Sequence, residues 1–253
     1  YFCVSRIEEE TLHYLLHEPV AATPPALNKL FRSIRVILVP YLETLPSPKV
    51  SKKSSNAPAK SVSKVLLRQA VSFVRPSKPR RIYWCALWYK NEAFLFLATD
   101  EKESVDLHHN FYNGIAKLVY ETLTEDVVAE FLNLLCGELA GSDHGEIDEH
   151  SWRLKENLIR RQNDPTRNTK LLQKYACQSM QDTLTLYMHG LCCDVGLETG
   201  PRQLSSQNVR RRLNLLRQIL PPPSGVALFP EELVAGQSGP PKKTTSECDE
   251  STT

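Results

Sequence analysis

The feature that most constrains the fold is the stretch from Arg80 to Asp100, which reads RRIYWCALWYKNEAFLFLATD. Two apolar segments, residues 82–89 and 93–98, flank the short polar break Lys90-Asn91-Glu92. Each segment has the length and aromatic content of one strand, and three polar residues suffice for a hairpin turn. Both sides of the first segment are apolar, which is typical of a strand covered on both faces. We therefore expect this hairpin to form the centre of a small antiparallel sheet on which helices pack.

Composition places the chain of 253 residues among ordinary globular proteins, with 41% hydrophobic and 24% charged residues. Such a chain can form one large domain or two small ones. A net charge of +2 gives no argument that the whole protein binds nucleic acid or membrane. The charges are uneven, because residues 1–100 hold 15 basic and 7 acidic side chains and residues 101–150 hold 2 basic and 12 acidic ones. Such blocks usually mark solvated faces or partner surfaces.

The seven cysteines have no regular spacing, and a chain of this size folds without disulfides. We expect reduced thiols in a cytoplasmic protein, with a nuclear location as the alternative. No apolar run approaches the roughly 18–20 residues that cross a membrane. Because the sequence begins with Tyr1 and not with Met, the absence of a targeting signal carries no weight.

Two helices are expected before the hairpin. Ser5-Arg6-Ile7-Glu8 has the form of a capping box, and the helix that it opens should end at Pro19. Thr23-Pro24-Pro25 favours the start of a second helix that reaches Leu45. The β-branched residues of segment 34–39 leave a strand as the alternative for its second half.

A basic, nearly apolar-free segment follows at residues 46–64, which include Lys52 and Lys53. Its Pro, Ser and Lys content predicts a disordered loop. We weigh a solvated linker above binding of nucleic acid or acidic lipid at this loop. Residues 65–74 fit either a strand, which would stand beside the hairpin, or a helix.

The remainder of the chain reads as helical. Apolar spacing and caps predict helices at residues 105–123, 124–139, 152–161, 164–194 and 207–220. The chain is thus of the α+β class, with a sheet domain at 1–145, a helical extension at 146–233 and a disordered tail at 234–253.

Two groups of residues have the chemistry of metal ligands. His189, Cys192 and Cys193 are near in sequence but lack the paired spacing of zinc sites, and neighbouring cysteines on a helix point about 100° apart. We favour buried structural cysteines. Residues 143–150 form an acidic loop with two histidines, and the spacing of a calcium loop is missing, so we favour a solvated loop.

Catalysis has little support in the sequence. There is no G-x-S-x-G motif and no glycine-rich loop for phosphate, and His108-His109 has the position of an exposed helix start. We expect no enzyme, no cofactor and no metal.

The sharpest basic cluster is Arg210, Arg211 and Arg212, with Arg217 one turn further. Three consecutive residues spread around a helix, so only part of the cluster can face a phosphate backbone. We favour a solvated helix, or a contact with the acidic block, over nucleic-acid binding. The alternative function is a nuclear complex subunit that contacts nucleic acid through residues 49–64 and 210–217.

The order of strand, aromatic hairpin and helix, with Phe111-Tyr112-Asn113-Gly114 in that helix, resembles the second half of a longin domain. It is most similar to longin domains of Rab-activating trafficking complexes such as the Hermansky–Pudlak kind, over about residues 65–140. This resemblance implies a module that pairs sheets and helices with other subunits and carries no catalytic group.

We therefore predict a non-enzymatic subunit or adaptor of a cytoplasmic multiprotein complex, with membrane traffic and small-GTPase regulation as its setting. One layer of helices cannot cover both the Trp84/Trp88 face and the Phe94/Phe96 face. The face that stays open would bind a partner subunit.

Overall fold

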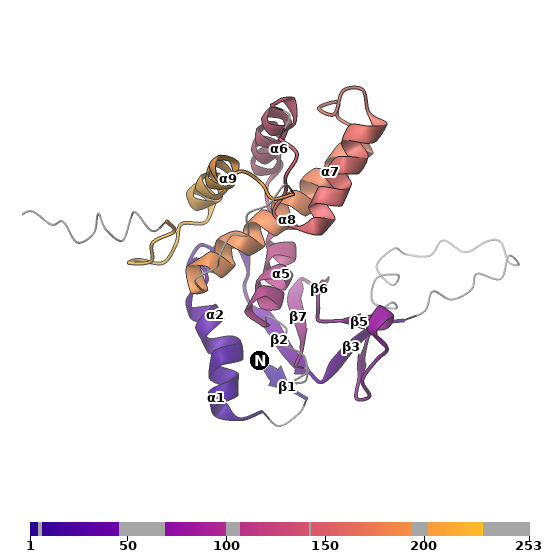
Figure 1. Cartoon of the computed structure of the whole chain (residues 1–253). Helices are drawn as coiled ribbons and strands as arrows, with labels where there is room; N and C mark the ends of the chain where they lie inside the picture. The colour runs from indigo at the N-terminus through magenta and orange to yellow at the C-terminus, as the bar shows by residue number, and fades with distance from the viewer. Residues whose placement is uncertain (5–6, 46–68, 100–106, 142, 194–201, 230–253) are drawn as a thin grey trace, which may run out of the picture.

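The computed structural model describes residues 1–4, 7–45, 69–99, 107–141, 143–193 and 202–229, and it confirms the α+β class. Figure 1 shows a small sheet region at one end and a cluster of long helices at the other. The strands are β1 (Phe2–Cys3), β2 (Ile34–Val39), β3 (Tyr41–Thr44), β4 (Gln69–Ser72), β5 (Arg81–Ile82), β6 (Trp84–Tyr89) and β7 (Glu92–Ala98). The helices of at least two turns are α5 (Leu107–Tyr120), α6 (Glu125–Ala140), α7 (Glu149–Arg161), α8 (Lys170–Cys192) and α9 (Ser206–Ile219).

The main sheet has the strand order β1-β2-β7-β6. The hairpin of β6 and β7 is antiparallel, and its turn at Lys90 and Asn91 has positive φ at both residues, as tight hairpin turns require. The pairings of β2 with β7 and of β1 with β2 are parallel. The sheet is therefore mixed, whereas we expected an antiparallel one. Helical segments lie between β1 and β2, and this crossover allows the two strands to run in the same direction.

A second, antiparallel sheet has the order β4-β3-β5. The chain passes from β2 into β3 across Pro40, which lacks the N–H that a continuous ladder would need. The expected helix to Leu45 is wrong in this half, and the strand alternative is confirmed, since the β-branched run fits a pleated sheet. Strand β4, within segment 65–74, pairs with β3 and not with the hairpin.

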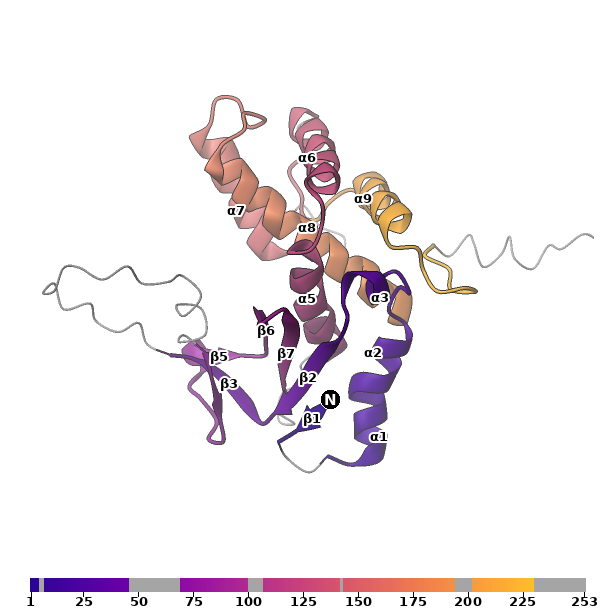
Figure 2. The same cartoon turned by 180° about the vertical axis from the view of Figure 1, so that it is seen from behind.

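The N-terminal helical segment consists of α1 (Glu9–Leu12), a π-helical stretch (His13–His17) and α2 (Glu18–Ala21). The helix continues past Pro19, contrary to expectation, because this proline lies in the first turn of α2, where its missing N–H costs little. The short α3 (Leu27–Leu30) then leads into β2. Figure 2 shows this segment beside the main sheet.

Four of the five expected C-terminal helices begin and end within three residues of the predicted bounds. The exception is α8, which begins at Lys170 with Thr169 as its cap, where the Thr169 hydroxyl accepts a hydrogen bond from the N–H of Leu172. The carboxylate of Asp164 instead accepts bonds from the N–H and hydroxyl of Thr166 in the preceding turn.

One large apolar core joins the sheet to the long helices, with members from Leu16 to Leu220. Helix α5 lies directly on β6 and β7, and Gly114 allows this close approach, because a Cβ there would collide with Cδ1 of Leu95. The motif Phe111-Tyr112-Asn113-Gly114 thus packs inside the molecule. The predicted boundary near residue 145 does not separate two cores.

The basic loop with Lys52 and Lys53 and the tail at 234–253 lie outside the described residues. Among the helices that are described, none combines the length and the apolar character that spanning a membrane requires.

Candidate functional site

The two faces of the main sheet differ in what covers them. Side chains alternate along each strand, and Trp84, Ala86 and Trp88 point to the helices together with Leu95 and pack on the large core. The ring of Trp88 stacks on Phe31 with centroids 5.7 Å apart. Of the four aromatic residues predicted to bind a partner, Trp84 and Trp88 thus lie on the face that the helices cover.

The opposite side of the sheet, here called the outer face, carries Arg35, Ile37, Leu87, Phe94 and Phe96 from three adjacent strands. Its four apolar side chains are only partly buried. Figures 1 and 2 show the long helices above the sheet and the N-terminal helical segment at its side, and no described helix packs on the outer face.

The second sheet closes one end of the outer face. A small cluster of Val39, Leu42, Cys85 and Ala98 is buried there, and Ile37, Leu87 and Phe96 pack at its margin. The burial of the Cys85 thiol raises its pKa, although Lys117 opposes this shift, so this thiol stays protonated.

The other end of the outer face remains open around Phe94. Tyr89 contacts Phe94 edge-on and is 46% exposed, and the guanidinium of Arg35 lies 6.0 Å from the Phe94 ring. Arg35 also forms an ion pair of 2.9 Å with Glu92 at the edge of this patch. An apolar centre with a charged rim is the usual composition of a protein–protein interface.

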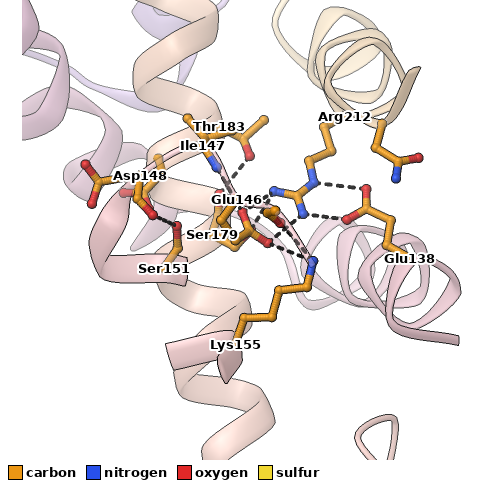
Figure 3. A network of polar contacts seen from close by, with 12 residues as sticks. Glu138, Glu146, Ile147, Asp148, Ser151, Lys155, Ser179, Thr183 and Arg212 are labelled. Atoms are coloured by element: carbon orange, nitrogen blue, oxygen red, sulfur yellow. Dashed lines mark hydrogen bonds and ion pairs between the residues drawn. The ribbon is translucent and has the colours of Figure 1, made fainter. Parts of the chain in front are cut away.

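The helical end of the molecule encloses a network of charged side chains, which Figure 3 shows in close view. At its centre is Arg212 from α9, whose side chain is fully buried. All five N–H groups of the guanidinium have acceptors, which are the carboxylates of Glu138 and Glu146 and the hydroxyl of Ser179. The prediction that Arg212 belongs to an exposed basic patch is therefore wrong.

Lys155 completes this network. Its ammonium donates to the carbonyl of Gly145 at 2.9 Å and lies 3.8 Å from Glu146 Oε1. Glu146 also accepts a bond from the hydroxyl of Tyr175. With two carboxylates and two cations the network is balanced in charge, which is the condition under which burying ions is tolerable.

The two carboxyls of the network shift in opposite directions, because burial raises the pKa of Glu138 in spite of Arg212, whereas the pKa of Glu146 is lowered. Burial alone would raise the pKa of the Glu146 carboxyl, but Arg212 and Lys155 lower it more, and the net shift is downward. Burial lowers the pKa of Lys155 against the attraction of Glu146. The group therefore acts as a fixed structural tie between α6, α7, α8 and α9, and it offers no free acid or base.

Glu146 and its loop correct a second expectation. We expected residues 143–150 to be solvated, and His144 and residues 148–150 are exposed. Glu146 is an exception, because it is 1% exposed and its backbone bonds to Arg202 and Leu204, which follow α8 in the sequence. Asp143 accepts a bond from the Asn208 side chain, and Asp148 caps α7. Nothing local in the sequence marks Glu146 as buried, because its partners lie 66 residues away in the case of Arg212.

The two remaining arginines of the cluster have separate neighbours. The Arg210 guanidinium lies 4.6 Å from the Phe229 ring, and Arg211 lines a shallow groove between α6 and α9 with Glu130. Because Arg212 is buried, it cannot contribute to the predicted phosphate-facing surface.

His189, Cys192 and Cys193, which we considered as metal ligands but favoured as buried structural residues, do not gather at one point, and both cysteines are only partly buried. His189 packs against the rings of His109 and Tyr112, whereas His108 lies against Cys192 and Cys193. His108 is 2% exposed, so the expectation of an exposed helix start is wrong for this residue, whereas His109 is exposed. No local pattern indicates this grouping, because 84 residues separate His108 from Cys192.

A cavity of about 530 Å³ at the edge of β6 is lined by Arg81, Trp84, Cys85, Asn110 and Lys117. The Lys117 ammonium donates to the Ala86 carbonyl at 2.7 Å, so it already serves the packing of α5 on the sheet. No pair of carboxylates lines this cavity, and its one thiol, Cys85, has a pKa that burial raises in spite of Lys117, so it is not an activated nucleophile.

No protein-family model matches this chain, and neither a curated protein nor a solved structure does. The function must therefore be argued from the arrangement of residues alone.

Proposed function

We propose that this protein is a non-catalytic subunit of a multiprotein complex and that it binds a partner subunit through the outer face. The observation that carries this proposal is the cluster of Leu87, Phe94 and Tyr89, which no described helix covers. Partly exposed apolar side chains that adjoin one another on a sheet are costly in water unless a partner covers them.

The charged rim suggests how the partner is oriented. Arg35 and Glu92 pair across adjacent strands beside Phe94, and both remain partly exposed. Rim charges of this kind contribute more to specificity and association rate than to affinity. The partner surface should be apolar at its centre with opposite charges placed to meet Arg35 and Glu92.

The finer proposal places the complex in membrane traffic. It is supported by the sequence resemblance to longin domains and by the packing of α5 on the hairpin of β6 and β7; the expected strand β4 lies in the second sheet and gives no support. Longin-type subunits assemble through sheets and helices, and the outer face would then be the docking surface. The alternative, binding of nucleic acid, is weakened by the burial of Arg212.

The proposal is tested by affinity purification of the full-length protein from cells, followed by sizing and mass spectrometry. We compare the wild type with Phe94→Glu, which places a charge at the centre of the outer face, and with Val20→Glu, which makes the same change at an exposed residue of α2. We expect a stoichiometric partner with the wild type and Val20→Glu that is lost with Phe94→Glu.

Circular dichroism of both variants shows whether the fold is retained. A wild-type protein that is monomeric in cell extracts would contradict the proposal, and so would a partner that Phe94→Glu retains at the same stoichiometry.

A further inference from the structure

The side chains of His108, Cys192 and Cys193 converge near the C-terminal end of α8. The Nδ1 atom of His108 lies 3.1 Å from Sγ of Cys193 and 3.8 Å from Sγ of Cys192. All three donor atoms lie within 4.8 Å of one another. Imidazole nitrogen and cysteine sulfur are the ligands that zinc prefers in proteins.

The conformation at the end of α8 explains how two adjacent cysteines reach one point. Cys192 is the last residue of the helix, and Cys193 is extended, with φ −128° and ψ 150°. The angle of about 100° between consecutive side chains applies only inside a helix. Because the chain leaves the helix at Cys193, its side chain turns back toward His108.

A second observation shows how the histidine ring is oriented. Nε2 of His108 lies 2.6 Å from the carbonyl oxygen of Tyr14, and a carbonyl oxygen only accepts hydrogen bonds. Nε2 therefore carries a proton, and Nδ1 is the ring nitrogen that faces the two sulfur atoms. Metal-binding histidines usually have this arrangement, in which the second ring nitrogen donates to a backbone carbonyl or carboxylate.

We propose that His108, Cys192 and Cys193 form a binding site for one Zn²⁺ ion. A tetrahedral ion with Zn–S bonds of about 2.3 Å and a Zn–N bond of about 2.0 Å holds its ligand atoms roughly 3.3–3.8 Å apart. The distances from His108 already fall near this range. Binding requires small movements of the side chains, and water takes the fourth position.

The site joins three segments that are far apart in the sequence. His108 lies in the first turn of α5, the cysteines end α8, and the Tyr14 carbonyl belongs to the π-helical stretch. His108 is buried while both cysteines are partly exposed, so an ion has a path to the sulfur atoms. A bound ion would fasten the N-terminal helical segment to α5 and α8 and stabilise the fold.

The experiment uses the full-length protein, reduced and treated with a chelator, and titrates it with Zn²⁺ against a chromophoric competitor. Two double variants remove the same number of thiols. Cys192→Ser/Cys193→Ser removes the site, and Cys136→Ser/Cys177→Ser removes two free cysteines elsewhere.

We expect one Zn²⁺ per chain for the wild type and for Cys136→Ser/Cys177→Ser. Removing a residue that only hydrogen-bonds to a metal ligand costs about 10–100-fold in metal affinity. Cys192→Ser/Cys193→Ser removes two ligands, so this variant should bind Zn²⁺ more than about 100-fold more weakly. Equal affinities of the two double variants would overturn the proposal, as would a wild type that binds no Zn²⁺.

A spectroscopic measurement on the wild type guards against a variant that fails to fold. Co²⁺ in the same site should give a sulfur-to-metal charge-transfer band in the near ultraviolet and the visible bands of a four-coordinate ion. Absence of the charge-transfer band when Co²⁺ is bound would show that the thiolates are not ligands and would overturn the proposal.

Discussion

The helical end of this molecule buries and pairs its charged side chains, whereas the sheet end leaves apolar side chains partly exposed. In the helical end, the charges of Arg212 and Glu146 are enclosed and every N–H of the guanidinium has an acceptor within the chain. In the sheet end, apolar groups such as Phe94 and Tyr89 stay partly exposed on the outer face. The helical end is complete in itself, whereas the sheet end is suited to a partner.

This difference predicts that substitutions in the helical end change stability, whereas substitutions in the sheet end change partner binding. A change inside the charged network leaves an unpaired buried ion, so it should act on the free energy of unfolding. A change on the outer face removes contacts that are partly solvated already, so it should act chiefly on binding. The predictions below test this division, beginning with the largest effect.

Arg212→Ala should lower the free energy of unfolding by about 3–5 kcal/mol, because Glu138 and Glu146 remain buried without their cation. Urea denaturation measures the loss. Arg211→Ala, at the exposed neighbouring position, should change stability by less than about 0.5 kcal/mol.

The same assay tests the comparison of the two ends directly. Phe94→Ser on the outer face should cost only about 1 kcal/mol, since its ring is partly exposed. The assignment of stability to the helical end and of binding to the sheet end is wrong if Arg212→Ala lowers the free energy of unfolding no more than Phe94→Ser does.

Asp182 on α8 is the exception to the completeness of the helical end. One carboxylate oxygen accepts a bond from Gln178. The Ser151 hydroxyl lies near the carboxylate but donates to the carbonyl of Asp148, so the second oxygen has no hydrogen-bond donor among the described residues. Burial raises the pKa of Asp182 to about 7; Gln178 and Ser151 oppose this shift, and the charges of Asp148 and Glu146 add to it.

Because this pKa is higher in the folded than in the unfolded chain, the folded state binds the proton more tightly. The contribution of Asp182 to stability is thus most favourable below about pH 4, and it is lost as the pH rises through about 7. Asp182→Asn should remove this loss and raise stability at pH 8 by up to about 4 kcal/mol.

Urea denaturation of wild type and Asp182→Asn at pH 5 and pH 8 measures the effect. Asp126→Asn on the exposed start of α6 is the control and should keep the pH dependence of the wild type. An identical pH dependence in Asp182→Asn would show that this carboxyl titrates normally.

Gly145→Ala should lower the free energy of unfolding by about 1–3 kcal/mol. A Cβ at this position would collide with the backbone carbonyl of Gln203, and this close approach holds the loop that delivers Glu146 to the network. Gly137→Ala on α6 is the matched control, because nothing lies within 4 Å of its Cβ position, and it should be neutral or stabilising by up to about 1 kcal/mol. Equal melting temperatures of the two variants would mean that the loop shifts to make room for the added Cβ.

The elements that the sequence predicted well are those with a local signal. The hairpin of β6 and β7 follows from two aromatic runs around Lys90 and Asn91, and α5, α6, α7 and α9 follow from the spacing of apolar residues and from caps such as Ser205. The prediction of a helix up to Leu45 was wrong because the β-branched run at 34–39 fits a pleated sheet, although its apolar residues also have helical spacing.

The sequence by itself determined the α+β class and the apolar character of both hairpin faces, because periodicity and turn chemistry act between residues that are near in the chain. The tertiary structure decided which face stays open, whether Arg212 is a surface charge or a buried one, and which histidine meets the cysteines. These depend on contacts across 66 to 85 residues. Over such separations, the packing of whole helices and strands sets which side chains meet, and no local pattern records it.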